Sequence, residues 1–208
     1  MKDKIVRCAH GVFNQKGIRN TTLRDIAQQV PISDGHLRYY FNTKEALIMA
    51  LFAQMDQEIG SFVHPGLLTR PTAGSLVETL TKSFAVMEDY GFFFTESPAL
   101  LAQYPRLSDA YQQLIANRRE LLLSVFEGYR RVGIFRQDRD AVLYKVLFEQ
   151  FFLVTDNWVK YARLPGDKPA SKSDLITNYV AVSLALLLPY FTDPLRSELT
   201  DWVIRVCA

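Results

Sequence analysis

Apolar residues near the start of the chain recur at the spacing of an amphipathic helix, and this periodicity constrains the fold more than any other feature. Ile5, Cys8, Ala9, Val12 and Phe13 follow the i, i+3, i+4, i+7, i+8 pattern of a helix that buries one face. The same periodicity returns along the chain, whereas sustained alternation of apolar and polar residues, which is typical of half-buried strands, does not occur. The sequence therefore predicts an all-α fold.

Turn and capping residues divide the first 47 residues into three short helices. Gly17 ends the first helix, and Thr22 and Asp25 have the spacing of a capping box at the start of the second. Pro31 breaks the second helix, and Ser33 can cap the third. This layout, with a short turn between the second and third helices, is that of a helix-turn-helix unit. The three expected helices cover residues 5–16, 23–29 and 34–40.

The rest of the chain continues in longer helical segments, without an internal repeat or a long linker. We therefore expect a helix-turn-helix domain over residues 1–47 and a helical domain over residues 48–208. The helices expected after residue 40 cover residues 44–60, 73–90, 98–104, 108–132, 140–163, 171–188 and 194–206.

The charge of the chain is unevenly distributed. The net charge of the whole chain is +2, but residues 1–47 carry eight basic and four acidic side chains, which gives +4 for this segment and −2 for the remainder. A small basic domain on a mildly acidic body indicates that the small domain binds a polyanion.

Several classes of protein are disfavoured. The longest apolar run, residues 180–188, is too short to span a membrane, and the segment after Lys4 is amphipathic and not the continuous apolar stretch of a secretory signal. Cys8 and Cys207 lie far apart with no CxxC motif, so we expect no disulfide framework, no metal site, no cofactor and a cytoplasmic location. No GxSxG motif or glycine-rich phosphate loop is present, and the histidines, His64 among them, lack acidic partners at metal-binding spacing, which argues against an enzyme.

The N-terminal segment carries a long motif at fixed spacing. Its residues are Ala9-x3-Phe13-x3-Gly17-x3-Thr21-Thr22-x3-Ile26-Ala27-x2-Val30-x-Ile32-Ser33-x-Gly35-x-Leu37-x2-Tyr40-Phe41-x2-Lys44-Glu45-x-Leu47. This motif resembles the signature of tetracycline-repressor-type (TetR/AcrR) bacterial transcriptional regulators. The resemblance implies that the third helix binds operator DNA, and that the helical body dimerises and commonly holds a small molecule.

Two positions depart from the family pattern. Pro31 stands where the family usually has glycine, and because the proline ring fixes φ near −65° we expect an altered turn there. Arg38 stands where the family usually has tyrosine, and its guanidinium can bind phosphate or recognise guanine, so we expect an altered operator preference.

The DNA-binding residues implied by the motif lie around the second and third helices and at the start of the fourth. Lys44 opposes the dipole of its own helix, so a phosphate partner explains it better than helix stability does. Thr22 can act as a helix cap alone, Asp34 can serve only the helix dipole, and the other exposed side chains can form a plain solvated helix end. The candidates are Thr22, Arg24, Ser33, Asp34, Gly35, His36, Arg38, Tyr39, Tyr40 and Lys44.

Two late helices, 140–163 and 171–188, are apolar around more than one face, which indicates a homodimer interface; burial within one chain is the alternative. Aromatic side chains elsewhere in the body are either core or the lining of a pocket for an apolar or aromatic ligand. The candidate interface residues are Phe148, Phe151, Phe152, Trp158, Tyr179, Val182 and Leu186, and the candidate ligand residues are Phe62, Phe84, Met87, Tyr90, Phe93, Tyr104, Tyr111, Phe126 and Gln150.

The favoured interpretation is a sequence-specific regulator that binds double-stranded operator DNA as a homodimer and is released by a small effector. A DNA-binding dimer without a ligand is one alternative, and a helical enzyme without a known motif is another.

Overall fold

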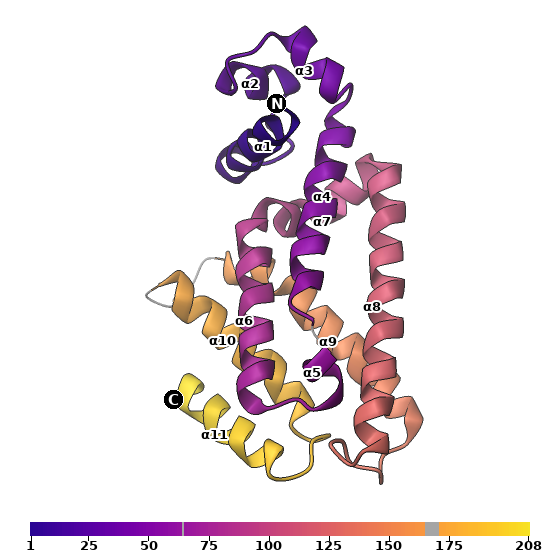
Figure 1. The fold of residues 1–208 in the computed structure, drawn as a ribbon. Helices are drawn as coiled ribbons and strands as arrows, with labels where there is room; N and C mark the ends of the chain where they lie inside the picture. Colours follow the sequence, from indigo (N-terminus) through magenta and orange to yellow (C-terminus); the bar gives the residue numbers. More distant parts are fainter. Residues whose placement is uncertain (64, 165–170) are drawn as a thin grey trace. The chain divides into compact units, whose positions relative to one another are not determined.

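The computed structural model describes residues 1–63, 65–164 and 171–208, and it confirms the all-α fold (Figure 1). The described residues form eleven helices and no strand, apart from an isolated antiparallel bridge between Phe135 and Phe191. His64 lies outside the described residues. The helices are α1 (Lys2–Lys16), α2 (Leu23–Gln29), α3 (Asp34–Tyr40), α4 (Lys44–Ser61), α5 (Pro65–Thr69), α6 (Ala73–Asp89), α7 (Gly91–Gln103), α8 (Pro105–Arg131), α9 (Ala141–Ala162), α10 (Lys172–Leu187) and α11 (Leu195–Cys207).

Residue contacts divide the chain into two compact units. The first unit contains Met1–Glu58 and Val86–Leu114, and the second contains Ile59–Ala85 and Ile115–Ala208. The first unit thus includes most of α4 and all of α7 in addition to the three N-terminal helices. The expectation of a domain boundary after residue 47 stays a prediction.

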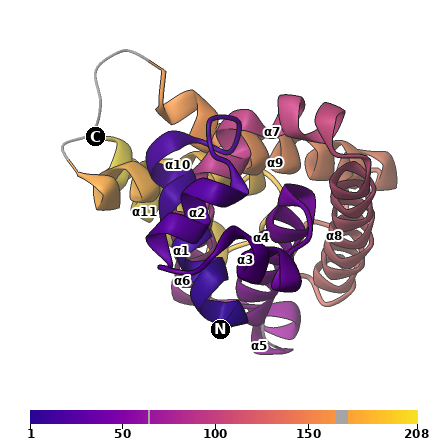
Figure 2. The ribbon, with the colours of Figure 1, turned by 90° about the horizontal axis from the view of Figure 1, so that it is seen from above.

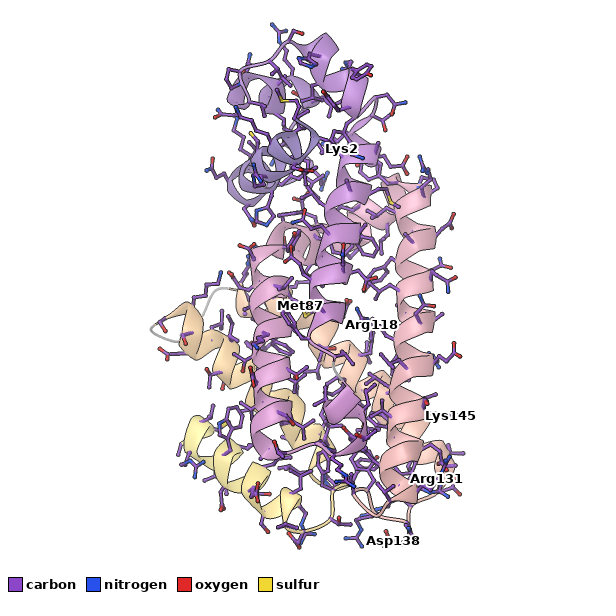
Figure 3. The ribbon with its side chains drawn as sticks, in the orientation of Figure 1. Lys2, Met87, Arg118, Arg131, Asp138 and Lys145 are labelled. Atoms are coloured by element: carbon purple, nitrogen blue, oxygen red, sulfur yellow. The ribbon has the colours of Figure 1, made fainter. Side chains whose placement is uncertain are left out.

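The three N-terminal helices pack around a small apolar core in the first unit. Helix α2 contacts both α1 and α3, as Figures 1 and 2 show. Ile5, Ile26 and Leu37, one from each helix, are fully buried, because the helical periodicity places them on facing sides. The ammonium of Lys2, which is labelled in Figure 3, lies 5.7 Å from the centroid of the Phe41 ring, a cation–π contact between the start of α1 and the end of α3.

Helix α7 differs from the sequence-based expectation. A helix over residues 98–104 was expected to begin at Pro98, but α7 runs from Gly91 to Gln103 with Pro98 inside it. Proline has no N–H to donate to the carbonyl of Phe94, and the Ser97 hydroxyl donates a 3.2 Å hydrogen bond to that carbonyl instead. A neighbouring side chain therefore satisfies the carbonyl that the proline leaves unpaired. Helix α5 was also not expected, and α8 begins three residues earlier than expected.

The second unit is built around α9, α10 and α11, with α10 packed against both of the others. Aromatic rings fill its interior: Phe84 stacks on Trp158 at 5.0 Å between centroids, and Phe135 stacks on Tyr144 at 5.9 Å. Among the described residues, no helix combines the length and the apolar character that a bilayer span requires.

Candidate nucleic-acid interface

The turn between α2 and α3 keeps a positive-φ residue although that residue is proline. Pro31 has φ 27°, far from the value near −65° that its ring prefers. The Ile32 N–H donates to the carbonyl of Ala27 at 3.1 Å, which is the longer hydrogen bond of a Schellman motif. The shorter bond of that motif cannot form because Pro31 has no N–H. The turn therefore keeps the longer hydrogen bond of the motif, lacks the shorter one and has a strained residue at its centre, so it is altered as expected.

Helix α3 begins with a cap and presents most of its side chains to solvent. The Ser33 hydroxyl accepts a 3.1 Å hydrogen bond from the His36 N–H, so Ser33 acts as the N-cap. Leu37 is the buried residue of the helix, and Tyr39 on the opposite side is 82% exposed. Helix α3 is thus fixed by its core side and free on its outer side, as a helix that enters a major groove must be.

An ion pair joins two of the predicted contact residues. Arg38 Nε donates to Asp34 Oδ2 at 2.7 Å, across one turn of α3. The other carboxylate oxygen, Asp34 Oδ1, is shielded from solvent and receives no hydrogen bond from the described residues. Acid four residues before base is the favourable order on a helix, so the spacing alone could have predicted this pair, although the two residues were considered separately.

The remaining outer residues of α3 form a small aromatic group. The His36 and Tyr40 rings lie 5.6 Å apart, and Tyr39 meets Tyr40 edge-on at 5.2 Å. A Cβ atom added at Gly35 would meet nothing within 4 Å, so the packing of the protein does not itself require glycine there. The absence of a side chain leaves the backbone open to close approach by DNA.

The capping box at the start of α2 is complete. Thr22 Oγ1 accepts the Asp25 N–H at 3.2 Å, and Asp25 Oδ2 accepts both the N–H and the hydroxyl of Thr22 at 2.7 Å. These hydrogen bonds, first that of the hydroxyl and then that of the N–H, lower the pKa of Asp25 below its ordinary value. The Thr22 hydroxyl donates its proton within the protein, so its capping role is the better supported one, while Arg24 is exposed.

Lys44 lies in the first turn of α4 and is half-buried. Burial lowers the pKa of its ammonium, and the nearby negative charges of Glu96 and Asp25 oppose that shift.

Glu96 on α7 supports the turn between α1 and α2. Its carboxylate accepts the N–H of Ile18 at 2.7 Å and the N–H of Arg19 at 3.2 Å. Asn14 Nδ2 donates to the carbonyl of Asp89 at 2.7 Å and adds a second contact between α1 and the end of α6. The sequence analysis missed Glu96, because its partners lie almost 80 residues away and leave no local pattern. Gly17, at φ 77°, directs the chain toward Glu96, and a Cβ there would lie 2.7 Å from the carboxylate.

Five of the candidate ligand residues belong to the first unit. Phe93 and Tyr111 come together, with ring centroids 6.0 Å apart. Tyr90 is buried and its hydroxyl donates to Glu58 at 3.3 Å; burial and the charge of Glu58 raise the pKa of Tyr90 above its ordinary range. Met87 is buried, and Tyr104 is half-buried.

The other candidate ligand residues belong to the second unit, which does not bring them into one cluster. Phe84 stacks on Trp158, whereas Phe126 packs against Phe135 and Tyr144. Phe62 is half-buried. Gln150 is exposed and lines a hollow of about 300 Å³ on α9 and α10 together with Arg139, Leu143, Ala185, Leu186, Pro189 and Tyr190.

The candidate dimer residues divide into buried and accessible groups. Phe148 and Trp158 are buried inside the second unit and offer no surface to a partner. Val182 is exposed, and Phe151, Phe152, Tyr179 and Leu186 are half-buried. The apolar side chains that α9 does expose include Val142, Leu143, Val146, Leu153 and Tyr161.

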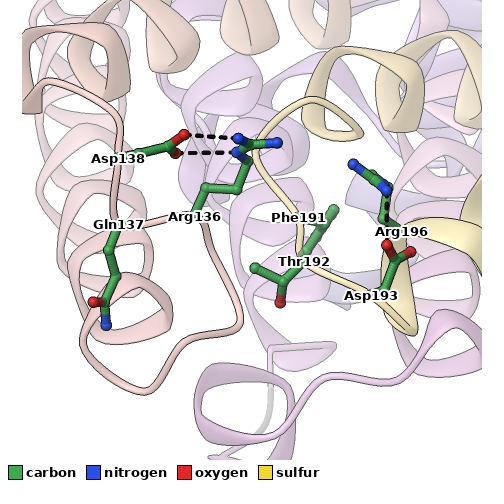
Figure 4. A pocket seen from close by; sticks show the side chains of 7 residues that line it. All are labelled: Arg136, Gln137, Asp138, Phe191, Thr192, Asp193 and Arg196. Carbon is green, nitrogen blue, oxygen red and sulfur yellow. Dashed lines mark hydrogen bonds and ion pairs between the residues drawn. The ribbon is translucent and has the colours of Figure 1, made fainter.

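A second hollow, of about 450 Å³, lies at the loops before α9 and α11 (Figure 4). Its two arginines are each paired with a neighbouring carboxylate, Arg136 with Asp138 and Arg196 with Asp193, both at 2.7 Å. The charges at this hollow are balanced by these pairs.

Two protein-family models together match nearly the whole chain. Residues 5–51 match the family described as bacterial regulatory proteins of the tetR family, and residues 54–199 match a family of bacterial transcriptional repressors. The transcriptional repressor KstR2 of Rhodococcus jostii is 27% identical over 146 residues, which cover 68% of this chain and 71% of that protein.

Solved structures share the fold. A TetR-family regulator from Marinobacter aquaeolei superposes with a TM-score of 0.84 at 22% identity, covering 99% of this chain and 98% of the other. The regulator FadR of Bacillus subtilis, solved with stearoyl-CoA, superposes with a TM-score of 0.64 at 20% identity, covering 90% of this chain and 96% of the other.

Proposed function

The chain belongs to the TetR family of bacterial transcriptional regulators and is a DNA-binding repressor, and from this premise we propose that it acts in the cytoplasm as a homodimer that a small apolar or aromatic effector releases from its operator. A single observation carries the DNA-binding part. Helix α3 is capped by Ser33 and anchored by Leu37, and its outer side presents Arg38, Tyr39 and His36.

The DNA contacts divide into two kinds. In this proposal Arg38 and Tyr39 on α3 contact base edges, while Arg24 and Lys44 at the starts of neighbouring helices contact phosphates. Lys44→Ala should therefore weaken binding to all sequences alike and reduce the slope of log affinity against log salt by about one unit per phosphate lost. Fluorescence anisotropy at several salt concentrations measures both quantities, and an unchanged slope would remove Lys44 from the phosphate contacts.

A homodimer is supported by the exposed apolar side chains of α9 and α10. Val142, Val146 and Leu153 recur along one face of α9, because eleven residues make about three helical turns. Gln150 is exposed on α9 and lines the hollow with Leu186 of α10, so its amide is available either to a ligand or to a second copy of the chain. Two recognition helices related by a twofold axis require half-sites about 10 base pairs apart or a multiple of that distance.

Leu153→Glu tests the dimer, because it would bury an unpaired charge from each subunit in the proposed apolar interface. Sedimentation equilibrium should show a 47.6 kDa particle, twice the 23.8 kDa of one chain, for the wild type and a 23.8 kDa particle for the variant. Ser124→Glu on the exposed side of α8 is the control and should stay dimeric. A monomeric wild type at micromolar concentration would rule out the dimer.

An apolar effector is supported by the aromatic content of both units and by the printed title of the FadR structure, which names a ligand with a long acyl chain. Helix α4 carries Lys44 at one end and extends past Glu58 into the second unit, so displacement of its C-terminal end acts on the DNA-contacting end. When the two recognition helices of a dimer move apart, they can no longer contact both half-sites at the same time, and the affinity for the operator falls.

Calorimetry tests the effector. Acyl-CoA compounds and small aromatic compounds are screened for a rise in melting temperature, and the compound that stabilises the protein most is titrated with and without operator DNA. Linkage requires operator DNA to weaken the binding of a releasing ligand by the same factor by which the ligand weakens DNA binding, about 5–150-fold. Equal affinities in the two titrations would favour a DNA-binding dimer that no ligand releases.

A further inference from the structure

Asp34 is an unusual residue to find on a surface that binds DNA, because its negative charge repels phosphates. We infer that Asp34 positions Arg38 so that the guanidinium contacts a guanine base with its terminal nitrogens, and that Asp34 thereby determines operator specificity. This inference rests on the proposed function, in which α3 contacts the operator. It adds that one residue of α3 recognises one particular base.

The geometry of the pair determines which nitrogens remain for DNA. Arg38 Nε is engaged by Asp34 Oδ2 at 2.7 Å, which leaves the two terminal nitrogens, Nη1 and Nη2, with their hydrogens available. Guanine presents two acceptors, O6 and N7, side by side in the major groove, and a planar pair of N–H donors matches them. An arginine whose inner nitrogen is already held loses less side-chain freedom when it makes this contact.

The charge of the pair disfavours the alternative contact, a phosphate. A free arginine gains affinity from any phosphate within reach, whatever the sequence. Arg38 with Asp34 is close to neutral as a pair, so that sequence-independent gain is reduced, while the hydrogen bonds to guanine are retained. Asp34 therefore raises the ratio of specific to non-specific binding rather than the affinity for DNA in general.

A purely local role for Asp34 explains less of the geometry. An exposed pair one turn apart on a helix stabilises that helix only slightly. Asp34 Oδ1 is also shielded from solvent without a hydrogen-bond donor among the described residues, so this one oxygen loses hydration in the observed position. The N-terminus of α3 already has its cap in Ser33.

The test uses the full-length protein and an operator selected from random double-stranded DNA by the wild type. Each guanine of the selected site is replaced in turn by 7-deazaguanine, which lacks the N7 acceptor but pairs normally. One position in each half-site should weaken wild-type binding about tenfold, and Arg38→Ala should be insensitive to that replacement. If no position weakens wild-type binding, Arg38 contacts no guanine and the inference is wrong.

Asp34→Asn then separates positioning from helix stability. The variant should bind unrelated DNA more tightly, with a salt slope steeper by about one unit per subunit, and its preference for the selected site should fall about tenfold. Asp3→Asn makes the same change of charge on exposed Asp3 in α1 and should leave the preference intact. Asp34→Glu, which keeps the charge, should retain part of the preference for the selected site that Asp34→Asn loses.

The outcomes distinguish this inference from the function on which it rests. If Asp34→Asn keeps a wild-type circular dichroism spectrum, wild-type preference and wild-type salt slope, the pair only stabilises α3, and operator binding by the protein stands. If the wild type selects no sequence from random DNA, operator recognition by α3 fails together with this inference.

Discussion

The short helices of the N-terminal region and the long helices of the second unit show how differently a sequence specifies a surface. Helices α2 and α3 have seven residues each, with caps at fixed positions and few buried side chains. Once the cap and the buried residues are identified, the remaining residues must be exposed. Helices α9 and α10 have 22 and 16 residues and are apolar on several faces. Phe148 and Trp158 face the interior there, whereas Val142 and Leu153, of similar apolar character, face outward. The exposed face of a short capped helix can therefore be predicted from local sequence signals, whereas the exposed face of a long apolar helix cannot.

The largest expected effect concerns the interior of the second unit. Phe84 is buried and stacks on Trp158, so Phe84→Ala should lower the free energy of unfolding by about 3–5 kcal/mol through the cavity that it creates. Val132→Ala, at a side chain that is 65% exposed, should change it by less than about 0.5 kcal/mol. Urea unfolding of the full chain measures both. A small loss for Phe84→Ala would instead favour Phe84 as a residue that lines an open ligand pocket.

A smaller effect is expected where the N-terminal region depends on a distant residue. Glu96→Gln replaces one of the two oxygens that accept the Ile18 and Arg19 N–H groups with an amide donor, so we expect a loss of about 1–2 kcal/mol. Glu78→Gln, which breaks the exposed pair with Lys82 on α6, is the control and should cost under about 0.5 kcal/mol.

Hydrogen exchange gives this second prediction a local measurement. The amides of residues 18 and 19 should exchange faster in Glu96→Gln than in the wild type, because their acceptor is weakened. Unchanged exchange at these two amides would mean that α1 and α2 hold their turn without α7, and that the N-terminal helices are as locally determined as their sequence motifs suggest.

The all-α fold and most helix bounds could be predicted because apolar periodicity, caps and glycine act over a few residues. The capping box of Thr22 and Asp25 and the cap of Ser33 are confirmed for the same reason. Helix α7 was partly missed, because the compensation of Pro98 by the Ser97 hydroxyl is a side-chain geometry that periodicity does not reveal. Glu96 was missed because its partners are distant in sequence, and the buried faces of α9 and α10 were not predictable because apolar residues occur on all of their sides.

The smallest expected effect concerns the turn between α2 and α3 in the N-terminal region. Pro31 has φ 27°, far from the value near −65° that its ring prefers, and it lacks the N–H that would complete the Schellman motif. Pro31→Gly should relieve this strain and allow a hydrogen bond to the carbonyl of Gln28, at the cost of a more flexible unfolded chain. We expect a net gain of about 1 kcal/mol in the free energy of unfolding. Pro31→Ala restores the N–H but keeps a Cβ at positive φ, so its gain should be smaller than that of glycine. Urea unfolding of the three proteins gives the order. If Pro31→Gly is less stable than the wild type, the rigidity that proline gives to the unfolded chain outweighs the strain at this turn.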